Sequence, residues 1–189
     1  MSIDNNIIKI LLKLKNFFNI KKELLTCFCN QGVQLEGWLK GELLNFLSNL
    51  KESKEIYNFD REVKSPVSNQ KIDFKLELKT DSKNEVLWLE IKHWLIGYQK
   101  GYKYNASFYF GDPTSVGIKL DVEKLSVIKS DNKYILILAT ANPGGEAWFN
   151  GVQKFNNKFS NFHIESLTDP NEFENFYFLG LLKIIDYKD

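Results

Sequence analysis

The sequence of 189 residues is poor in arginine and cysteine, and each shortage excludes something. Arg61 is the only arginine, so bidentate recognition of guanine by guanidinium groups would be scarce, although lysine still contacts phosphate as a point charge. The two cysteines, Cys27 and Cys29, are too few for a four-ligand zinc site and too close in sequence for a good disulfide. We therefore expect ordinary free thiols in a reducing cytoplasm.

No sign of charge dominates, because the formal net charge is +1. A strongly basic footprint for nucleic acid is thereby excluded, and any basic surface must be local. Hydrophobic residues make up 43% of the chain and charged residues 26%, which suits a folded domain with a sizeable core better than a disordered chain. The length fits a single domain over residues 1–189.

The sequence also lacks an uninterrupted apolar run of the length that crosses a membrane. Residues 1–30 are apolar but interrupted by lysines, and they contain no small-residue cleavage site. Their apolar side chains recur at helical spacing (Ile7, Leu11, Leu14 and Phe18), which predicts an amphipathic helix packed on the domain. Binding of this helix to a membrane surface is the weaker alternative, and we expect no membrane partner.

Hydrophobic periodicity predicts a mixed α/β order for the rest of the chain. The expected elements are a helix, three antiparallel strands, a crossover helix and a buried strand (residues 33–50, 55–63, 70–79, 85–94, 122–129 and 133–142). A strand, a crossover helix and a second strand form a right-handed parallel unit, so the sheet should be mixed. Asp121 is expected to be the N-cap of the crossover helix. Residues 143–189 should add a surface helix and further strands.

Two charged residues, Glu90 and Lys92, interrupt the apolar segment LWLEIKHW. Residues i and i+2 of a strand share a face, so these side chains point the same way. A hairpin turn at residues 81–82 places Asp73 opposite Glu90, with Cβ atoms about 5 Å apart. Two carboxylates this close repel each other unless something positive lies between them. Lys92 is one candidate, and a divalent cation is a better one, since carboxylate oxygens suit Mg²⁺, Mn²⁺ or Ca²⁺.

This pattern resembles the PD-(D/E)xK nuclease superfamily, whose members share the restriction-endonuclease-like fold. The residues that carry the resemblance are Asp73 in KIDFKLEL, Glu90, Ile91 and Lys92 in LWLEIKHW, and Glu42 in the preceding helix segment LKGELL. The order α-β-β-β-α-β over residues 33–142 matches the family core, to which this chain adds an N-terminal helix. The chain departs from the pattern at Ile72, which replaces the proline that usually precedes the aspartate.

The resemblance implies a role for each matching residue. Asp73 and Glu90 would ligate a Mg²⁺ or Mn²⁺ ion, and the main-chain carbonyl of Ile91 would complete that side. Glu42 would reach the same metal through water, or a second metal. Lys92 would hold or activate the attacking water. The implied activity is metal-dependent hydrolysis of phosphodiester bonds, with DNA as the partner, in restriction, phage defence, repair or a mobile element.

Further residues are candidates for contact with nucleic acid. Residues 98–110 interleave aromatic side chains with lysines, which suits stacking on bases and contact with phosphate (Lys100, Tyr102 and Lys103). A hairpin or lid packed on the core is the alternative for this segment. Lys124, in the first turn of the crossover helix, either approaches phosphate or is an ordinary solvated lysine. His93 points opposite to Lys92 by strand alternation, so we expect it to be buried or at an interface, and not catalytic.

Two other interpretations stay open. In the first, the charged strand face is an exposed set of salt bridges that contributes little stability. Against it, Trp88 and Val86 share this face, so the charges are expected at the edge of a core. In the second, the chain keeps a nuclease fold without the reaction and serves as a catalytically inactive nucleic-acid-binding or assembly subunit. A homodimer is a further expectation, since many such nucleases cut both strands as dimers.

Overall fold

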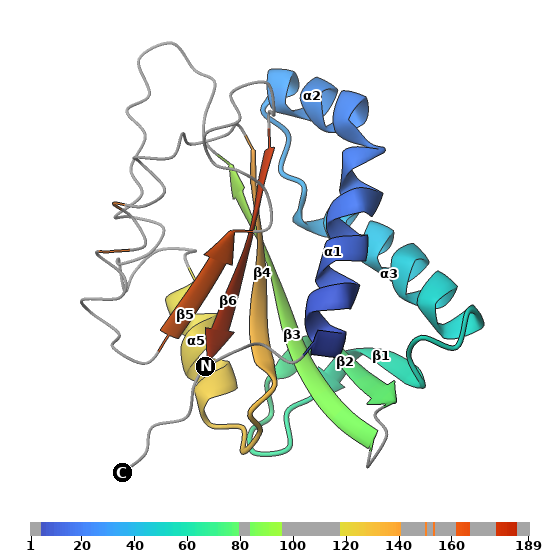
Figure 1. The fold of residues 1–189 in the computed structure, drawn as a ribbon. Helices are drawn as coiled ribbons and strands as arrows, with labels where there is room; N and C mark the ends of the chain where they lie inside the picture. The colour runs from blue at the N-terminus through green and yellow to red at the C-terminus, as the bar shows by residue number, and fades with distance from the viewer. Residues whose placement is uncertain are drawn as a thin grey trace.

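The computed structural model of the chain describes residues 5–79, 84–95, 118–140, 150, 153, 162–166 and 177–184. In this part of the chain a central sheet is covered by α1, α2 and α3 on one face and by α5 on the other (Figure 1). The elements are α1 (Asn5–Asn19), α2 (Lys22–Gln31), α3 (Glu36–Glu52), β1 (Asn58–Lys64), β2 (Lys71–Lys79), β3 (Asn84–Leu95), α5 (Lys119–Ser126), β4 (Lys133–Thr140), β5 (Phe162–Ser166) and β6 (Tyr177–Ile184).

The sheet has six strands in the order β1-β2-β3-β4-β6-β5. Every neighbouring pair is antiparallel except β3 and β4, which α5 connects as a parallel pair. The predicted mixed α/β class is therefore confirmed, and so is the order of helix, three strands, helix and strand, which α3, β1, β2, β3, α5 and β4 follow. The predicted C-terminal strands are β5 and β6, while the predicted helix before them lies almost entirely outside the described residues.

Strand β4 is the centre of the fold. All eight of its residues are buried, because β3 and β6 flank it and helices cover both of its faces. A strand in this position needs apolar side chains on both faces, which is why its sequence is a continuous apolar run without alternation. The strand therefore fixes the position of β3, which carries Glu90 and Lys92.

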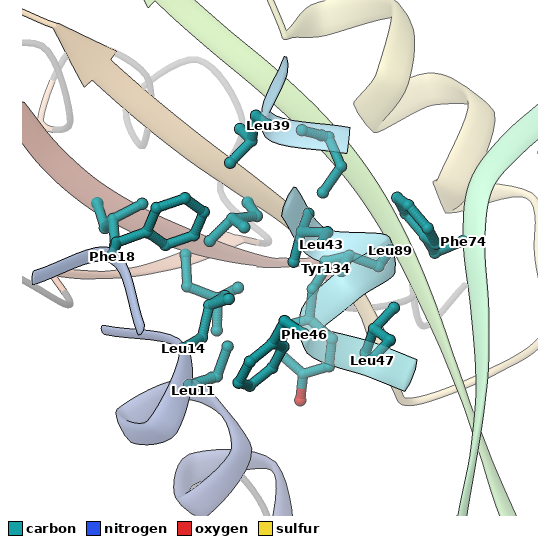
Figure 2. Close-up of a cluster of buried hydrophobic side chains, with 14 of the residues drawn as sticks. Leu11, Leu14, Phe18, Leu39, Leu43, Phe46, Leu47, Phe74, Leu89 and Tyr134 are labelled. Atoms are coloured by element: carbon teal, nitrogen blue, oxygen red, sulfur yellow. The ribbon is translucent and has the colours of Figure 1, made fainter. Parts of the chain in front are cut away.

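The N-terminal segment forms two helices where the sequence analysis predicted one. The amide of Lys21 donates to the carbonyl of Phe18 at 2.9 Å, a tighter turn that ends α1 before α2 begins. The predicted apolar stripe of α1 is buried in the core formed with α3 and the sheet (Ile7, Leu11, Leu14 and Phe18). Figure 2 shows Leu11, Leu14 and Phe18 in this core. Each such side chain contributes about 1.5–3 kcal/mol on burial. No helix within the described ranges is long and apolar enough to cross a membrane.

Helix α5 packs on the opposite face of the sheet through its own small core (Ile118, Val122, Leu125 and Ile128 against Ile135 and Ile137). The prediction that Asp121 caps this helix is wrong. The helix begins at Lys119 and has no side-chain cap, and Leu120 is 60% exposed. Asp121 therefore lies in the first turn of the helix, where its buried carboxylate faces lysines.

Candidate active site

Asp73 and Glu90 meet where the pairing of β2 with β3 stops. The predicted hairpin register is confirmed, since Phe74 pairs with Leu89, and Asp73 and Glu90 occupy the next position. The backbones no longer pair there. Instead the amide of Asp73 donates to Glu90 Oε1 at 3.3 Å, and the amide of Ile91 donates to Asp73 Oδ2 at 2.9 Å. The two carboxylates thus accept hydrogen bonds from backbone amides where the regular ladder ends.

The other neighbour of β2 is also irregular at this point. The ladder between β1 and β2 omits the position where Glu62 faces Asp73, and Glu62 has a φ of 48°. A positive φ is uncommon for a residue other than glycine and costs about 1–3 kcal/mol. Ile72 and Phe74 of β2 belong to different core clusters, on opposite faces of the sheet, although residues two apart in a regular strand share a face. The side chains of β2 therefore change from one face of the sheet to the other at Asp73.

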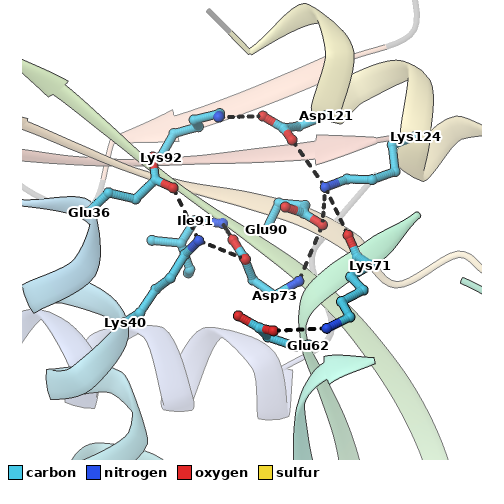
Figure 3. A network of polar contacts seen from close by, with 10 residues as sticks. All are labelled: Glu36, Lys40, Glu62, Lys71, Asp73, Glu90, Ile91, Lys92, Asp121 and Lys124. Carbon is cyan, nitrogen blue, oxygen red and sulfur yellow. Dashed lines mark hydrogen bonds and ion pairs between the residues drawn. The ribbon is translucent and has the colours of Figure 1, made fainter. Parts of the chain in front are cut away.

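Lysines approach the two carboxylates from opposite helices (Figure 3). Lys40 of α3 lies 2.8 Å from Asp73 Oδ1, and it also lies 3.1 Å from Glu36, one turn earlier on the same helix. Burial opposes the charge of Lys40, but the hydrogen bonds and charges of Asp73 and Glu36 raise its pKa overall. Lys40 is therefore held as a cation beside Asp73.

Glu90 is only 2% exposed. Its Oε1 lies 2.7 Å from the ammonium of Lys124 in α5. Burial and the nearby charge of Asp73 raise the pKa of Glu90 to about 8, even though Lys124 acts in the opposite direction. Burial also opposes the charge of Lys124, yet Glu90 and Asp121 raise its pKa. The pair is a buried acid and base in a small region of low dielectric, where each charge depends on the other.

Lys92 lies on the same face of β3 as Glu90, as predicted, and this face is turned toward α5. Its ammonium is 3.0 Å from Asp121 Oδ2. Among the described residues this buried oxygen accepts no hydrogen bond, so the contact is an ion pair without hydrogen-bond geometry. Asp121 Oδ1 lies 3.2 Å from Lys124, so one carboxylate of α5 links two lysines.

The structure does not bring Glu42 to this group of residues. Its carboxylate lies 3.0 Å from the ammonium of Lys21 instead. Two residues correspond to about 200° of rotation around a helix, so Glu42 cannot share a face with Lys40. Glu36 is the acid of α3 that does share this face. The spacing of Glu36 and Lys40, four residues apart, was the available signal for it.

The remaining candidates fall into two groups. Lys100, Tyr102 and Lys103 lie outside the described residues. Lys124 is not the solvated lysine of the second alternative, because its side chain is largely buried in the ion-pair network, while its contact with phosphate stays a prediction. The expected ligation by the Ile91 carbonyl stays a prediction, because the contact found here uses the amide of that residue.

His93 lies on the opposite face from Lys92 and is buried, as predicted. The amide of Leu35 donates to its Nδ1 at 2.9 Å, the side chain of Gln34 contacts the same nitrogen, and Nε2 lies 2.6 Å from Thr140 Oγ1. Burial lowers the pKa of His93 to about 4. Burial also raises the pKa of the neighbouring Cys29 thiol to about 11, despite a hydrogen bond with Thr140. This polar group links α3 to the sheet and contains no reactive thiolate.

By type, the donors at the site fit a hard divalent cation, because Asp73, Glu90 and Asp121 offer carboxylate oxygens. Their arrangement fits such an ion only in part. In the described portion of the chain, no three His, Cys, Asp or Glu side chains gather closely enough to hold a metal by themselves. The shared centre is the pair Asp73 and Glu90, and lysine ammonium groups engage an oxygen of each.

Comparisons with family models, with curated proteins and with solved structures give no match to this chain. The fold and the site by themselves define a mixed α/β protein with a buried network of carboxylates and lysines.

Proposed function

We propose that this protein is a metal-dependent nuclease of the PD-(D/E)xK type that hydrolyses phosphodiester bonds in DNA in the cytoplasm. The observation that carries the proposal is the meeting of Asp73 with Glu90 at the break in the sheet, with Lys92 on the adjacent position of the same face. The order of α3, β1, β2, β3, α5 and β4 agrees with the restriction-endonuclease-like core that belongs to this proposal.

Asp73 and Glu90 are the residues that would hold Mg²⁺ or Mn²⁺, joined by the main-chain carbonyl of Ile91. A bound ion of this kind polarises a phosphoryl oxygen and lowers the pKa of bound water. Lys92 would orient the attacking water and offset the charge of the phosphate. Asp121 holds the Lys92 ammonium, so it is a positioning residue in this scheme.

The energetics of the network support a functional role over a purely structural one. Burying carboxylates and ammonium groups together costs desolvation energy that their mutual attraction often fails to recover. A well-packed apolar cluster would stabilise the same region at least as well. Groups with strongly shifted pKa values that converge in one place are typical of functional sites, and the pKa of Glu90 is raised to about 8.

The test is cleavage of a panel of supercoiled, linear and single-stranded DNA, with RNA for comparison, in Mg²⁺, Mn²⁺ or EDTA. We expect cleavage in either metal and none in EDTA. Glu90→Gln and Lys92→Met should abolish it with the circular dichroism spectrum unchanged. Glu77→Gln is the matched control, because Glu77 lies on the same hairpin but pairs with Lys75 away from the site.

A catalytically inactive binding or assembly subunit is the second candidate, and one observation favours it. Asp73 and Glu90 already have lysine partners at 2.8 and 2.7 Å, so their charges are compensated without a metal. This candidate predicts no cleavage and no rise in melting temperature in Mn²⁺, since only a ligand of the folded state stabilises it. Size-exclusion chromatography with mass detection would test the homodimer that either candidate allows.

A further inference from the structure

The ammonium of Lys124 lies among three oxygens that come from three different elements. Glu90 Oε1 of β3 is 2.7 Å away, Asp121 Oδ1 of α5 is 3.2 Å away, and the carbonyl oxygen of Lys71 at the start of β2 is 3.2 Å away. Figure 3 shows these contacts converging on one nitrogen. An ammonium has three N–H donors, and three acceptors surround it here. With 13% of its side chain exposed, Lys124 is well shielded from water.

Such a set of oxygens is suited to more than an ammonium. Two carboxylates and one main-chain carbonyl are the ligand types that hard divalent cations take in proteins. Without a positive charge between them, Glu90 and Asp121 would repel each other in a buried place. Glu90 Oε1, which holds Lys124, is also the oxygen that a cation ligated by Glu90 would use, so the ammonium and the cation compete for it.

We propose that Lys124 is a built-in counter-ion that occupies the cation position at Glu90 when no metal is bound and thereby sets the metal affinity of the site. The proposal rests on the proposed function only in assigning Glu90 as a metal ligand. Binding of a divalent cation requires the ammonium to leave Glu90. Asp121 lies three residues earlier on the same helix, so it retains the displaced ammonium close by.

The experiment compares Lys124→Met with the unchanged chain by isothermal titration with Mn²⁺ and by thermal unfolding, both without nucleic acid. In EDTA the variant should melt at a lower temperature, because Glu90 loses its counter-charge. Mn²⁺ should restore the loss, and it should bind the variant at least about tenfold more tightly, since a competing unit charge a few ångströms away is gone. Sodium chloride at matched ionic strength should not restore the melting temperature of the variant.

Lys119→Met is the matched control. Lys119 belongs to the same helix but faces Glu123, which is no part of the network. Its melting temperature and Mn²⁺ affinity should equal those of the unchanged chain. If Lys124→Met fails to fold without metal, Lys124→Gln keeps a donor for Glu90, and it should show the same gain in affinity. The double variant Lys124→Met/Glu90→Gln should fold in EDTA and gain nothing from Mn²⁺.

An Mn²⁺ affinity of Lys124→Met and Lys124→Gln within twofold of the unchanged chain would overturn the inference. That result is distinct from failure of the nuclease proposal. Tighter Mn²⁺ binding by the variants without cleavage of any nucleic acid supports the counter-ion role and rejects the nuclease. Metal-dependent cleavage by the unchanged chain, with unaltered Mn²⁺ affinity in the variants, supports the nuclease and rejects the counter-ion role.

Discussion

The amide of Ile91 donates to the carboxylate of Asp73 at the position where β2 and β3 cease to pair. This contact replaces a backbone hydrogen bond with one from a side chain, so the strands separate without leaving the amide unsatisfied. The carboxylate that makes it is also the one that Lys40 holds from α3. A structural feature of the sheet and a feature of the proposed site therefore depend on the same residue.

Replacing Asp73 should separate these two contributions. Asp73→Asn keeps an oxygen for the amide of Ile91 and removes the charge that faces Lys40, so we expect a loss of about 1 kcal/mol in the free energy of unfolding. Asp73→Ala removes the acceptor of the Ile91 amide as well, while Lys40 keeps Glu36 as its partner, so this variant should cost about 2–3 kcal/mol. Urea denaturation measures both values, and equal losses would show that the contact with Ile91 contributes nothing.

Stability should fall in acid because of His93. Its pKa is lowered from 6.5 to about 4 in the folded chain, so between these values the unfolded chain binds a proton that the folded chain does not. The free energy of unfolding therefore decreases as the pH falls from 6.5 to 4, by about 3 kcal/mol from this residue. The raised pKa of Glu90 acts in the opposite direction, with stability lost as the pH rises toward 8.

A comparison with His93→Gln isolates the acid-sensitive contribution, since Glu90 is present in both proteins. The variant loses packing and hydrogen bonds, so its overall stability should be lower. Its difference from the unchanged chain should shrink steadily as the pH is lowered from 6.5 to 4, measured by denaturation at each pH. A difference that stays constant over this interval would contradict burial of a neutral histidine.

The core that supports α3 should be sensitive to truncation. Leu43 of α3 is buried in the core that α3 forms with α1 and the sheet. Leu43→Ala should therefore cost about 2–5 kcal/mol in the free energy of unfolding. Leu12 belongs to α1 but is 53% exposed, and Leu12→Ala should change stability by less than about 0.5 kcal/mol. Similar losses in the two variants would mean that α1 and α3 do not pack as described.

The sequence and the structure make different predictions for two acids of α3, Glu36 and Glu42. The resemblance assigns Glu42 to the site, whereas the structure places Glu36 beside Lys40 and Glu42 beside Lys21. If the proposed function holds, Glu36→Gln should lower the rate of DNA cleavage by a few fold through a less firmly held Lys40. Glu42→Gln should leave it unchanged. Loss of activity only in Glu42→Gln would favour the assignment from the sequence.

The hairpin register, which brings Asp73 opposite Glu90, could be predicted from the sequence because the alternation of apolar and polar residues leaves little freedom of register. The helix face was harder to predict, since α3 carries acids at several angular positions and only its packing decides which one faces the site. Asp121 was misassigned because an aspartate before an apolar helical run has the same local signature as an N-cap. Lys124 meets Glu90 only through packing of α5 on the sheet, which no local pattern encodes.

The most direct test of the central proposal is the initial rate of DNA cleavage in Mn²⁺ for the unchanged chain and for Glu90→Gln, at equal fractions of folded protein. The account predicts metal-dependent cleavage by the first and a loss of at least about a hundredfold in the second, since one of the two acids proposed to hold the ion is gone. Equal rates in the two proteins, or no cleavage of any nucleic acid by the unchanged chain, would contradict it.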